Sequence, residues 1–276
     1  MALPRIPLGD GVELAVEWVD ANFGGILDLL SMVLGTLVGG LKDLLLFLPP
    51  VAMAAFIAAL VWGVSRRNLK MATGTLLGLL LIESMQLWSL SMETLALVIS
   101  STIVALMIGI PVGVLCSRND TANGVITPIL DLMQTMPSFV YLIPAVIFFG
   151  LGNVPGIIAT VVFAMPPTIR LTNLGIRQVA NDLLEVAEAF GSTPRQKLLK
   201  VQLPLAMPTI MAGVNQCIML SLSMVVIAAM IGARGLGYQV LVGIQRVDIG
   251  TGFEAGLAIV IIAMVLDRIT RSLTKR

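Results

Sequence analysis

The run ETLALVISSTIVALMIGIPVGVLC, from Glu93 to Cys116, decides the fold class, because its only charged residue is the glutamate at its start. An apolar run of about 20 residues has the length needed to cross a hydrocarbon core of roughly 30 Å. Six further runs are similarly apolar: Leu44–Val64, Met71–Trp88, Val125–Phe149, Val154–Leu171, Ala206–Ile231 and Ala255–Ile269. The sequence therefore predicts an all-α integral membrane protein with about seven transmembrane helices.

The composition supports a membrane protein and weakens several enzyme classes. Of the 276 residues, 57% are hydrophobic and 12% are charged, whereas a soluble domain carries roughly 25% charged residues. With 17 basic and 16 acidic side chains, the net charge predicts no nucleic-acid partner. The absence of histidine removes the commonest general base and metal ligand. Cys116 and Cys217 lie in apolar stretches and are expected to be small buried residues.

The segment before the first predicted span has its own pattern. Its apolar residues recur at helical spacing, while small and polar residues occupy the other side, which favours an interfacial helix. An eighth span over Asn22–Leu41 stays open, because only Asp28 interrupts it. Four acidic residues argue against a cleaved signal peptide: Asp10, Glu13, Glu17 and Asp20.

The positive charges predict the orientation. If Arg177–Lys200 is cytoplasmic and there are seven spans, the N-terminus faces outside and the C-terminus faces the cytoplasm. Thirteen basic residues then lie inside: Arg66, Arg67, Lys70, Arg118, Arg170, Arg177, Arg195, Lys197, Lys200, Arg268, Arg271, Lys275 and Arg276. Only Arg5, Lys42, Arg234 and Arg246 lie outside.

Proline and glycine are frequent within the spans. Each proline removes a backbone hydrogen bond that lipid cannot replace, so these helices should pack on others or line a polar cavity. The segments GTLLG, GIPVG and GFEAG place two glycines four residues apart, which permits close helix contact. With 26 glycines in the chain, such matches are also expected by chance.

The longest polar stretch between spans, Arg177–Pro204, predicts two short helices joined by a tight turn. Asp182 is expected to cap the first helix, with Glu185 three residues later, and Gly191 suits the left-handed residue that ends it. A second helix is expected to follow at once. Its shape would be that of a docking element, although a simple connection between two spans is an equally open interpretation.

The second helix carries its own start and stop signals. Thr193 is expected to cap it, with Pro194 at its first position and Gln196 completing a capping box. Pro204 is expected to end it.

The run EVAEAFGSTPRQKLLKVQLP resembles the cytoplasmic signature loop of ABC importer permeases. The matching positions are Glu185, Val186, Ala187, Gly191, Val201, Leu203 and Pro204, with Val186 in place of the usual alanine. Three longer stretches resemble the bacterial glycine betaine, proline, choline and carnitine permeases: TPILDLMQTMPSFVYLIPA, FAMPPTIRLTNLGIRQV and LSMVVIAAMIGARGLG. The resemblance runs from about Glu93 to Arg271 and is looser over residues 1–90.

This resemblance implies a type I ABC importer permease fold with a five-helix core in the bacterial plasma membrane. It divides the chain into residues 1–43 with the interfacial helix, residues 44–90 with two accessory helices, and a core over residues 91–276. The core contains the coupling loop, residues 177–204. The implied partners are a second permease chain, with a homodimer expected, two ATP-binding subunits and an external substrate-binding protein.

No GxxxxGK[ST] phosphate loop occurs in the sequence, so ATP and magnesium are expected on the partner subunits and the chain is expected to be non-catalytic. No cofactor or metal is expected on the chain itself. By the resemblance, the coupling loop contacts the ATP-binding subunit. The residues expected to make this contact are Glu185, Ala187, Glu188, Gly191, Leu203 and Pro204.

The expected cargo is a compact quaternary or methylated amine such as glycine betaine, choline, carnitine or proline betaine. Aromatic cages hold such groups, yet only 5% of the chain is aromatic, so selectivity is expected mainly in the binding protein. The candidate pathway residues are Asp131, Gln134, Met136, Pro137, Tyr141, Ser221 and Ser223. Ordinary helix packing competes with substrate contact at each. Asp131 could equally tie helices together or face the cavity.

Three rival functions have less support in the sequence. An ion-coupled secondary transporter would need an acidic or histidine relay, and the only candidate residues for it are Glu83 and Asp131. A membrane scaffold that recruits an ATPase would use the same docking element without cargo. A membrane enzyme lacks histidine and any convergent nucleophile cluster.

Overall fold

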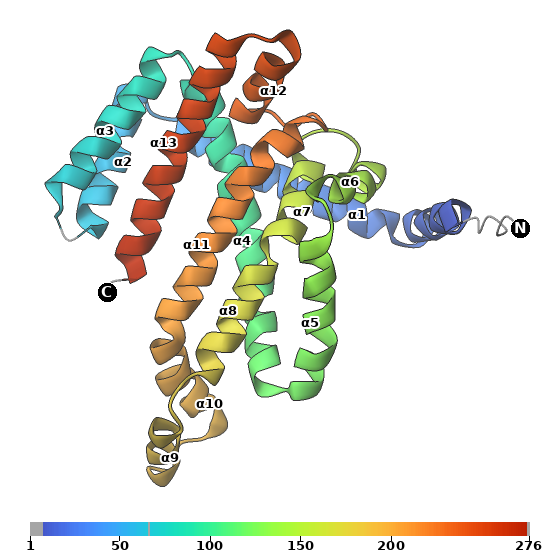
Figure 1. Ribbon diagram of the computed structural model, residues 1–276, viewed down its shortest axis with the longest axis vertical. Helices are drawn as coiled ribbons and strands as arrows, with labels where there is room; N and C mark the ends of the chain where they lie inside the picture. The colour runs from blue at the N-terminus through green and yellow to red at the C-terminus, as the bar shows by residue number, and fades with distance from the viewer. Residues whose placement is uncertain (1–7, 66, 275–276) are drawn as a thin grey trace, which may run out of the picture.

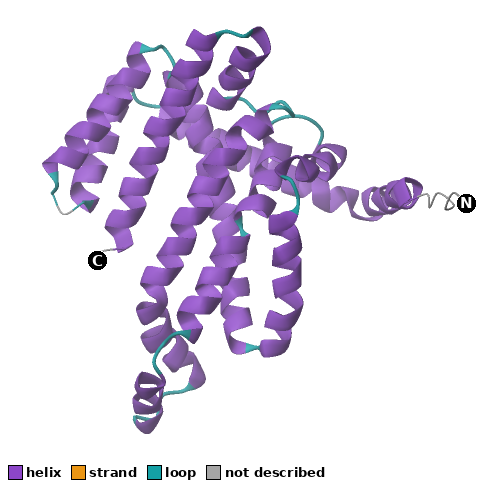
Figure 2. Cartoon of the chain, viewed as in Figure 1, coloured by secondary structure: helices purple, strands orange, loops and turns teal. Residues whose placement is uncertain are grey.

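The computed structural model describes residues 8–65 and 67–274, and every element within them is helical (Figure 2). This agrees with the predicted fold class. The helices, in chain order, are α1 Leu8–Leu46, α2 Pro50–Val64, α3 Leu69–Ser84, α4 Trp88–Arg118, α5 Asp120–Thr135, η1 Ser138–Tyr141, α6 Leu142–Phe149, α7 Asn153–Ala164, α8 Pro166–Arg177, α9 Asn181–Ala189, α10 Pro194–Lys197, η2 Leu198–Gln202, α11 Leu203–Ala229, α12 Leu236–Arg246 and α13 Ile249–Thr274.

The long helices α4, α8, α11 and α13 run along one direction of the molecule (Figure 1). The short helices α9 and α10 project from one end of this bundle, and α6, α12 and α1 lie toward the other. Residues 181–202, which hold α9, α10 and η2, are called the elbow below. Length and composition qualify five segments of the described chain to cross a membrane: Val16–Leu46, Trp88–Arg118, Asn153–Arg177, Pro194–Ala229 and Ile249–Leu273.

Three predicted spans differ from the structure. The predicted span Met71–Trp88 is one of them, because α3 ends at Ser84 and Trp88 is the first residue of α4. The chain leaves helical geometry between α1 and α2, so the first predicted span begins at Pro50 instead of Leu44. The predicted span Val125–Phe149 is broken, because α5 and the η1–α6 segment are bent by 108°. Pro137 lies at the break with φ −56° and ψ 138°, an extended conformation that ends α5, and its ring removes a backbone donor. Counted as one, the bent pair is a sixth span, while α2 and α3 are shorter, at 15 and 16 residues.

Helix α1 lies across the bundle near the end opposite the elbow (Figure 1). Both sides of α1 contribute to its contact with the bundle, and Leu34 and Val38 of the apolar side are buried there. Gly35 lies against Val154 of α7, and Lys42 donates to Glu93 of α4 at 2.5 Å. Many large apolar side chains of α1 are exposed, such as Ile26 and Met32. Because Val16–Leu46 has the length and composition of a span, the interfacial helix and the eighth span both remain predictions.

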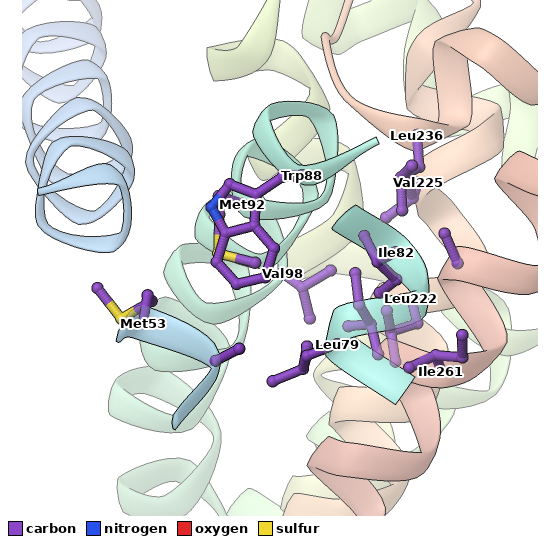
Figure 3. Close-up of a cluster of buried hydrophobic side chains, with 13 residues drawn as sticks. Met53, Leu79, Ile82, Trp88, Met92, Val98, Leu222, Val225, Leu236 and Ile261 are labelled. Carbon is purple, nitrogen blue, oxygen red and sulfur yellow. The ribbon is translucent and has the colours of Figure 1, made fainter. Parts of the chain in front are cut away.

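One buried cluster joins the accessory helices to the rest of the bundle (Figure 3). Helix association in lipid depends on close packing, because lipid tails are as apolar as leucine. The labelled members of the cluster are Met53, Leu79, Ile82, Trp88, Met92, Val98, Leu222, Val225, Leu236 and Ile261, which come from α2, α3, α4, α11, α12 and α13. The hairpin α2–α3 is therefore an integral part of the packed bundle.

The GIPVG segment makes a close helix crossing, between α4 and α8. A Cβ placed on Gly113 would lie 2.6 Å from Cβ of Thr172 and 2.8 Å from the carbonyl oxygen of Ile169. Gly109 lies similarly against Thr168. These two glycines let the α4 and α8 backbones approach more closely than any larger residue would permit.

Candidate functional site

The elbow begins with α9, whose start differs from the prediction. The helix begins at Asn181, its N-cap is Ala180, and no side chain caps it. Asp182 is therefore not the cap but lies in the first turn, where a carboxylate still interacts favourably with the helix dipole. The capping box expected between Asp182 and Glu185 does not form, because the helix starts two residues too early for it.

The turn between α9 and α10 agrees with the sequence. Gly191 has φ +73°, a conformation that side chains disfavour, and its N–H donates to the Glu188 carbonyl at 2.8 Å. The N–H of Ser192 donates to the Ala187 carbonyl at 3.0 Å. These two bonds satisfy carbonyls at the end of α9.

The start of α10 also agrees with the sequence. The hydroxyl of Thr193 accepts from the N–H of Gln196 at 3.3 Å, and the Gln196 side chain accepts from the N–H of Thr193 at 2.8 Å. Pro194 follows at the first helical position. The capping box and the glycine turn give the elbow a defined shape from local sequence alone.

The second helix of the elbow does not end at Pro204, contrary to the prediction. It passes through the π-helical turn η2 directly into α11, giving one continuous segment, Pro194–Ala229. In η2 the N–H of Leu203 bonds to the carbonyl of Leu198, five residues earlier. Pro204 then occupies the first turn of α11, where a missing N–H is tolerated. The elbow is thus joined without a break to a transmembrane helix.

The outer face of α9 is apolar although it projects from the bundle (Figure 1). Leu183, Val186 and Phe190 are exposed, and the side chain of Phe190 is 87% exposed. They lie three and four residues apart, so they share one helix face. The sequence interpretation named Val186 only as a departure from a motif and missed Leu183 and Phe190. Their helical spacing in a segment between spans was the available signal.

The predicted coupling residues occupy different places on the elbow. Ala187 is buried and Pro204 is exposed. Leu203 is half-buried and packs against a cluster of buried residues formed by Ile176, Leu198, Ala206 and Ile210. Glu188, expected to meet a basic residue of a partner, is paired with Lys197 of α10 within the chain. Glu185 is exposed and has no ion pair within residues 8–65 and 67–274.

Asp131 lies on α5, just before the break. Its carboxylate accepts from Nη2 of Arg170 on α8 at 2.5 Å, and its side chain is 59% exposed in the single chain. Asp131 therefore ties α5 to α8, one of the two roles left open by the sequence. A charge pair within a spanning segment is costly against lipid, so residues of this kind usually face other protein or water.

The other predicted pathway residues divide into exposed and buried groups. Gln134, Pro137 and Ser223 are exposed, and Met136 is half-buried. Tyr141 is buried, with its hydroxyl donating to the Met133 carbonyl across the break. Ser221 is buried and accepts from the hydroxyl of Thr102 on α4 at 3.5 Å. Tyr141 and Ser221 thus make internal contacts, whereas the exposed residues are available to another chain or to solvent.

A polar ladder beside Asp131 was not foreseen from the sequence. Arg177 donates to the Asp120 carboxylate at 2.6 Å, to the Cys116 carbonyl at 2.7 Å and to Asn173 at 2.9 Å. Asn173 in turn donates to Asn123 at 2.7 Å. These bonds link α4, α5 and α8 at the elbow end. Only the three-dimensional arrangement brings these residues together.

Within the described residues, no group of three or more His, Cys, Asp or Glu side chains is placed to hold a metal ion. The arrangement instead offers a protruding apolar helix continuous with a spanning helix, and an intramembrane charge pair beside a broken span.

Comparisons with known proteins are consistent with this geometry. Residues 105–276 match the family described as binding-protein-dependent transport system inner membrane component. The glycine betaine transport system permease protein OpuAB of Bacillus subtilis is 52% identical, covering 98% of this chain and 95% of its own. The glycine betaine/carnitine transport permease protein GbuB of Listeria monocytogenes is 48% identical, with 99% and 98% covered.

Among solved structures, an inward-facing form of the MetNI methionine ABC transporter aligns with a TM-score of 0.60 and 25% identity. The alignment covers 68% of this chain and 95% of that one. The likeness therefore extends over most of the bundle, and its low identity supports the fold and not the cargo.

Proposed function

The chain belongs to the binding-protein-dependent transport system inner membrane components, and from this premise we propose which cargo it carries and how it is driven. It is a multi-pass permease subunit of an ABC importer in the bacterial inner membrane. We propose that its cargo is a small osmolyte, glycine betaine or a similar quaternary amine. The support is the identity above to permeases whose names carry glycine betaine and carnitine.

One observation carries the proposed mechanism: the elbow presents an exposed apolar face, centred on Phe190, on a helix pair continuous with α11. Exposed apolar patches of this kind mark protein contact sites. The elbow is proposed to bind an ATP-binding subunit, which carries ATP and magnesium and hydrolyses the nucleotide. Movement of that subunit is transmitted through η2 into α11, and this shifts the bundle between two states.

The proposed orientation places the elbow and the C-terminus in the cytoplasm and the N-terminus outside. The support is the distribution of basic residues, since cytoplasmic ends carry the excess of lysine and arginine. Toward the elbow end lie the turn between α2 and α3 with the start of α3, the C-terminal ends of α4, α8 and α13, and the elbow itself (Figure 1). The basic residues of these segments are Arg67, Lys70, Arg118, Arg177, Arg195, Lys197, Lys200, Arg268 and Arg271. Toward the other end lie Lys42, Arg234 and Arg246. An external binding protein would then deliver cargo at the α1 and α12 end.

The pathway is proposed to lie along the exposed face of α5, α6 and α11, between two copies of the chain. The support is that Asp131, Gln134, Pro137 and Ser223 are exposed in one chain although they belong to spanning segments. Charged and polar groups are costly against lipid, so a second copy and an aqueous path would be their environment. Tyr141 and Ser221 would support this face from within.

The docking role is tested by Phe190→Asp in the reconstituted complex with its ATPase and binding protein. A charge on the apolar face should reduce uptake at least tenfold and abolish stimulation of ATP hydrolysis by loaded binding protein. The matched control is Phe47→Asp, because Phe47 is 82% exposed but lies away from the elbow. Equal uptake by both variants would contradict the docking role.

The orientation is tested with a single introduced thiol, Ser192→Cys. The native cysteines Cys116 and Cys217 are both buried and give little background. A membrane-impermeant maleimide should label the variant in inside-out vesicles and not in intact cells. Labelling in intact cells would place the elbow outside and overturn the mechanism.

Two further measurements separate the rival functions. Uptake that collapses with an uncoupler while ATP stays high would indicate a secondary transporter. A chain that binds the ATPase but shows no cargo-stimulated ATP hydrolysis, even with the binding protein present, would indicate a scaffold.

A further inference from the structure

Helices α3 and α13 lie next to each other in the bundle (Figure 1). Residues of both line a groove on the elbow side of their crossing. The two helices touch where a Cβ on Gly78 would lie 2.9 Å from Cγ2 of Ile261, a residue also labelled in Figure 3. One turn nearer the elbow end, Gly74 has nothing within 4 Å of the corresponding position. The helices have therefore diverged there and leave a cavity of about 570 Å³.

The walls of this groove are mostly apolar and its mouth is basic. Met71, Met264 and Val265 line the walls, together with the open position at Gly74. Lys70 and Arg268 lie at the end nearest the elbow. From Ile261 to Arg268 the helix rises about 10 Å, which is enough for part of an acyl chain. The groove thus combines an apolar slot with a cationic rim.

Neither cation at the rim has an acidic partner within the described residues, and both side chains are exposed. The nearest acid in sequence, Asp267, is already occupied, because it accepts from Arg271 at 2.8 Å and from Asn215 at 3.2 Å. The side chain of Asn68 caps α3 by accepting from two backbone N–H groups. The rim therefore offers two uncompensated positive charges and little that would compete with an anion.

We propose that the groove binds one anionic phospholipid. An acyl chain lies along the slot between α3 and α13, and the phosphate diester lies between Lys70 and Arg268. Basic pockets between transmembrane helices on the cytoplasmic side recognise anionic head groups in this way. The apolar length favours a lipid over a free phosphate, and the absence of an acid at the rim calls for a negatively charged occupant.

The bound lipid would complete the packing between the hairpin α2–α3 and α13. These elements meet in the cluster of Figure 3 but separate toward the elbow end, and the lipid fills the space left there. The inference rests on the proposed orientation, with the elbow end of the bilayer-embedded chain in the cytoplasm. It is independent of the cargo and of the docking role of the elbow.

The charge requirement is tested on the intact complex, purified from membranes that contain phosphatidylglycerol and phosphatidylethanolamine. Native mass spectrometry counts each lipid retained per complex. Each basic residue contributes about fivefold in affinity, so the double variant Lys70→Gln/Arg268→Gln should lose more than tenfold in retained phosphatidylglycerol. The control Arg246→Gln removes a charge at the other end and should retain the wild-type amount.

The slot is tested separately with the charges intact. Gly74→Leu fills the open position without meeting a neighbour and should displace the lipid, whereas Gly63→Leu, at an equally open position outside the groove, should not. The site would be supported if retained phosphatidylglycerol falls in the double variant and in Gly74→Leu but not in the two control variants. Equal retention in all variants, or retention of phosphatidylethanolamine as strong as that of phosphatidylglycerol, would overturn it. Full uptake by a lipid-free variant would leave the transport proposal intact.

Discussion

The elbow and the break between α5 and α6 are both interruptions between helices, yet they are built differently. The elbow is closed by bonds between near neighbours, at Gly191 and within the box of Thr193 and Gln196. At the break, Pro137 is extended, and the main stabilising contact joins residues that are distant in sequence, Asp131 and Arg170. The first is specified by local chemistry, and the second by the packing of separate helices.

This difference explains why the sequence predicts one interruption and not the other. In a polar segment, caps and a left-handed glycine are visible as residue types at fixed spacing. In an apolar run, hydropathy reports only that lipid is the solvent, and a proline is tolerated inside many spanning helices. Pro111 stays within α4 and Pro208 stays within α11, so Pro137 carried no distinct signal.

The largest effect is expected at Gly191, where φ is +73°. Gly191→Val places a β-branched residue in the left-handed region, which costs about 1–2 kcal/mol locally and should distort the docking face. Uptake should fall at least tenfold while membrane insertion is unchanged. The measurements are uptake of labelled betaine and the amount of protein in the membrane fraction.

Gly191→Asn is the matched variant, because asparagine adopts the left-handed conformation readily. It should keep uptake within about twofold if backbone conformation is what the glycine supplies. An equal loss in both variants would mean that the partner needs the empty space. Unchanged uptake in both would remove Gly191 from the mechanism and leave the elbow without the role assigned to it.

The next effect concerns the break. Asp131→Ala leaves Arg170 without its partner in a spanning segment and should destabilise the protein by about 1–3 kcal/mol. Because Asp131 is half exposed in the single chain, the lower part of this range is expected. The double variant Asp131→Ala/Arg170→Leu should recover much of the loss, as measured by thermal unfolding in lipid nanodiscs.

A double-mutant cycle on the same pair sharpens the comparison. A coupling energy above about 1 kcal/mol would place the pair in a region that water screens poorly. Effects that add within about 0.5 kcal/mol would mean that Asp131 and Arg170 act independently. The break would then be held by Pro137 and the Tyr141 hydroxyl alone.

A smaller and more local effect is expected at Thr193. Thr193→Ala removes one half of the capping box and should weaken the start of α10 by about 1 kcal/mol. Amide hydrogen exchange should accelerate in α10 and remain unchanged in α8. Ser192→Ala is the control, because no hydrogen bond of the neighbouring Ser192 hydroxyl contributes to the box. Equal acceleration in both variants would contradict a specific cap.

The candidate site shows the same limit of sequence reasoning as the fold. The sequence predicts the two short helices of the elbow, but its most exposed apolar residue, Phe190, lies outside the motif positions from which the contact residues are predicted. Pro204 was expected to stop a helix, yet the π-helical turn before it lets the helix continue. Apart from the bond between Arg177 and Asn173, the charge pair and the polar ladder join residues 39 to 61 positions apart, a separation that no local pattern records.

The smallest effect is expected at a third interruption, between α12 and α13. The left-handed position there is Val247, with φ 56°, where the elbow has Gly191. A β-branched residue in this conformation is strained, and the 81% exposed side chain makes little packing contact in return. Val247→Gly should therefore raise the free energy of unfolding by about 0.5–1 kcal/mol, and the melting temperature should rise accordingly.

The turn at Val247 is held independently of its side chain, which makes this test selective. The N–H of Asp248 donates to the Gly243 carbonyl at 2.9 Å, and the Asp248 carboxylate accepts from the N–H and hydroxyl of Thr251. Val260→Gly, at an exposed position in the interior of α13, should instead destabilise by about 1 kcal/mol. If Val247→Gly also destabilised the protein, the left-handed conformation of Val247 would not be a source of strain that lowers the free energy of unfolding. Because the left-handed position is a valine and not a glycine, its strain is visible only in the backbone, as the break at Pro137 is visible only in the packed bundle.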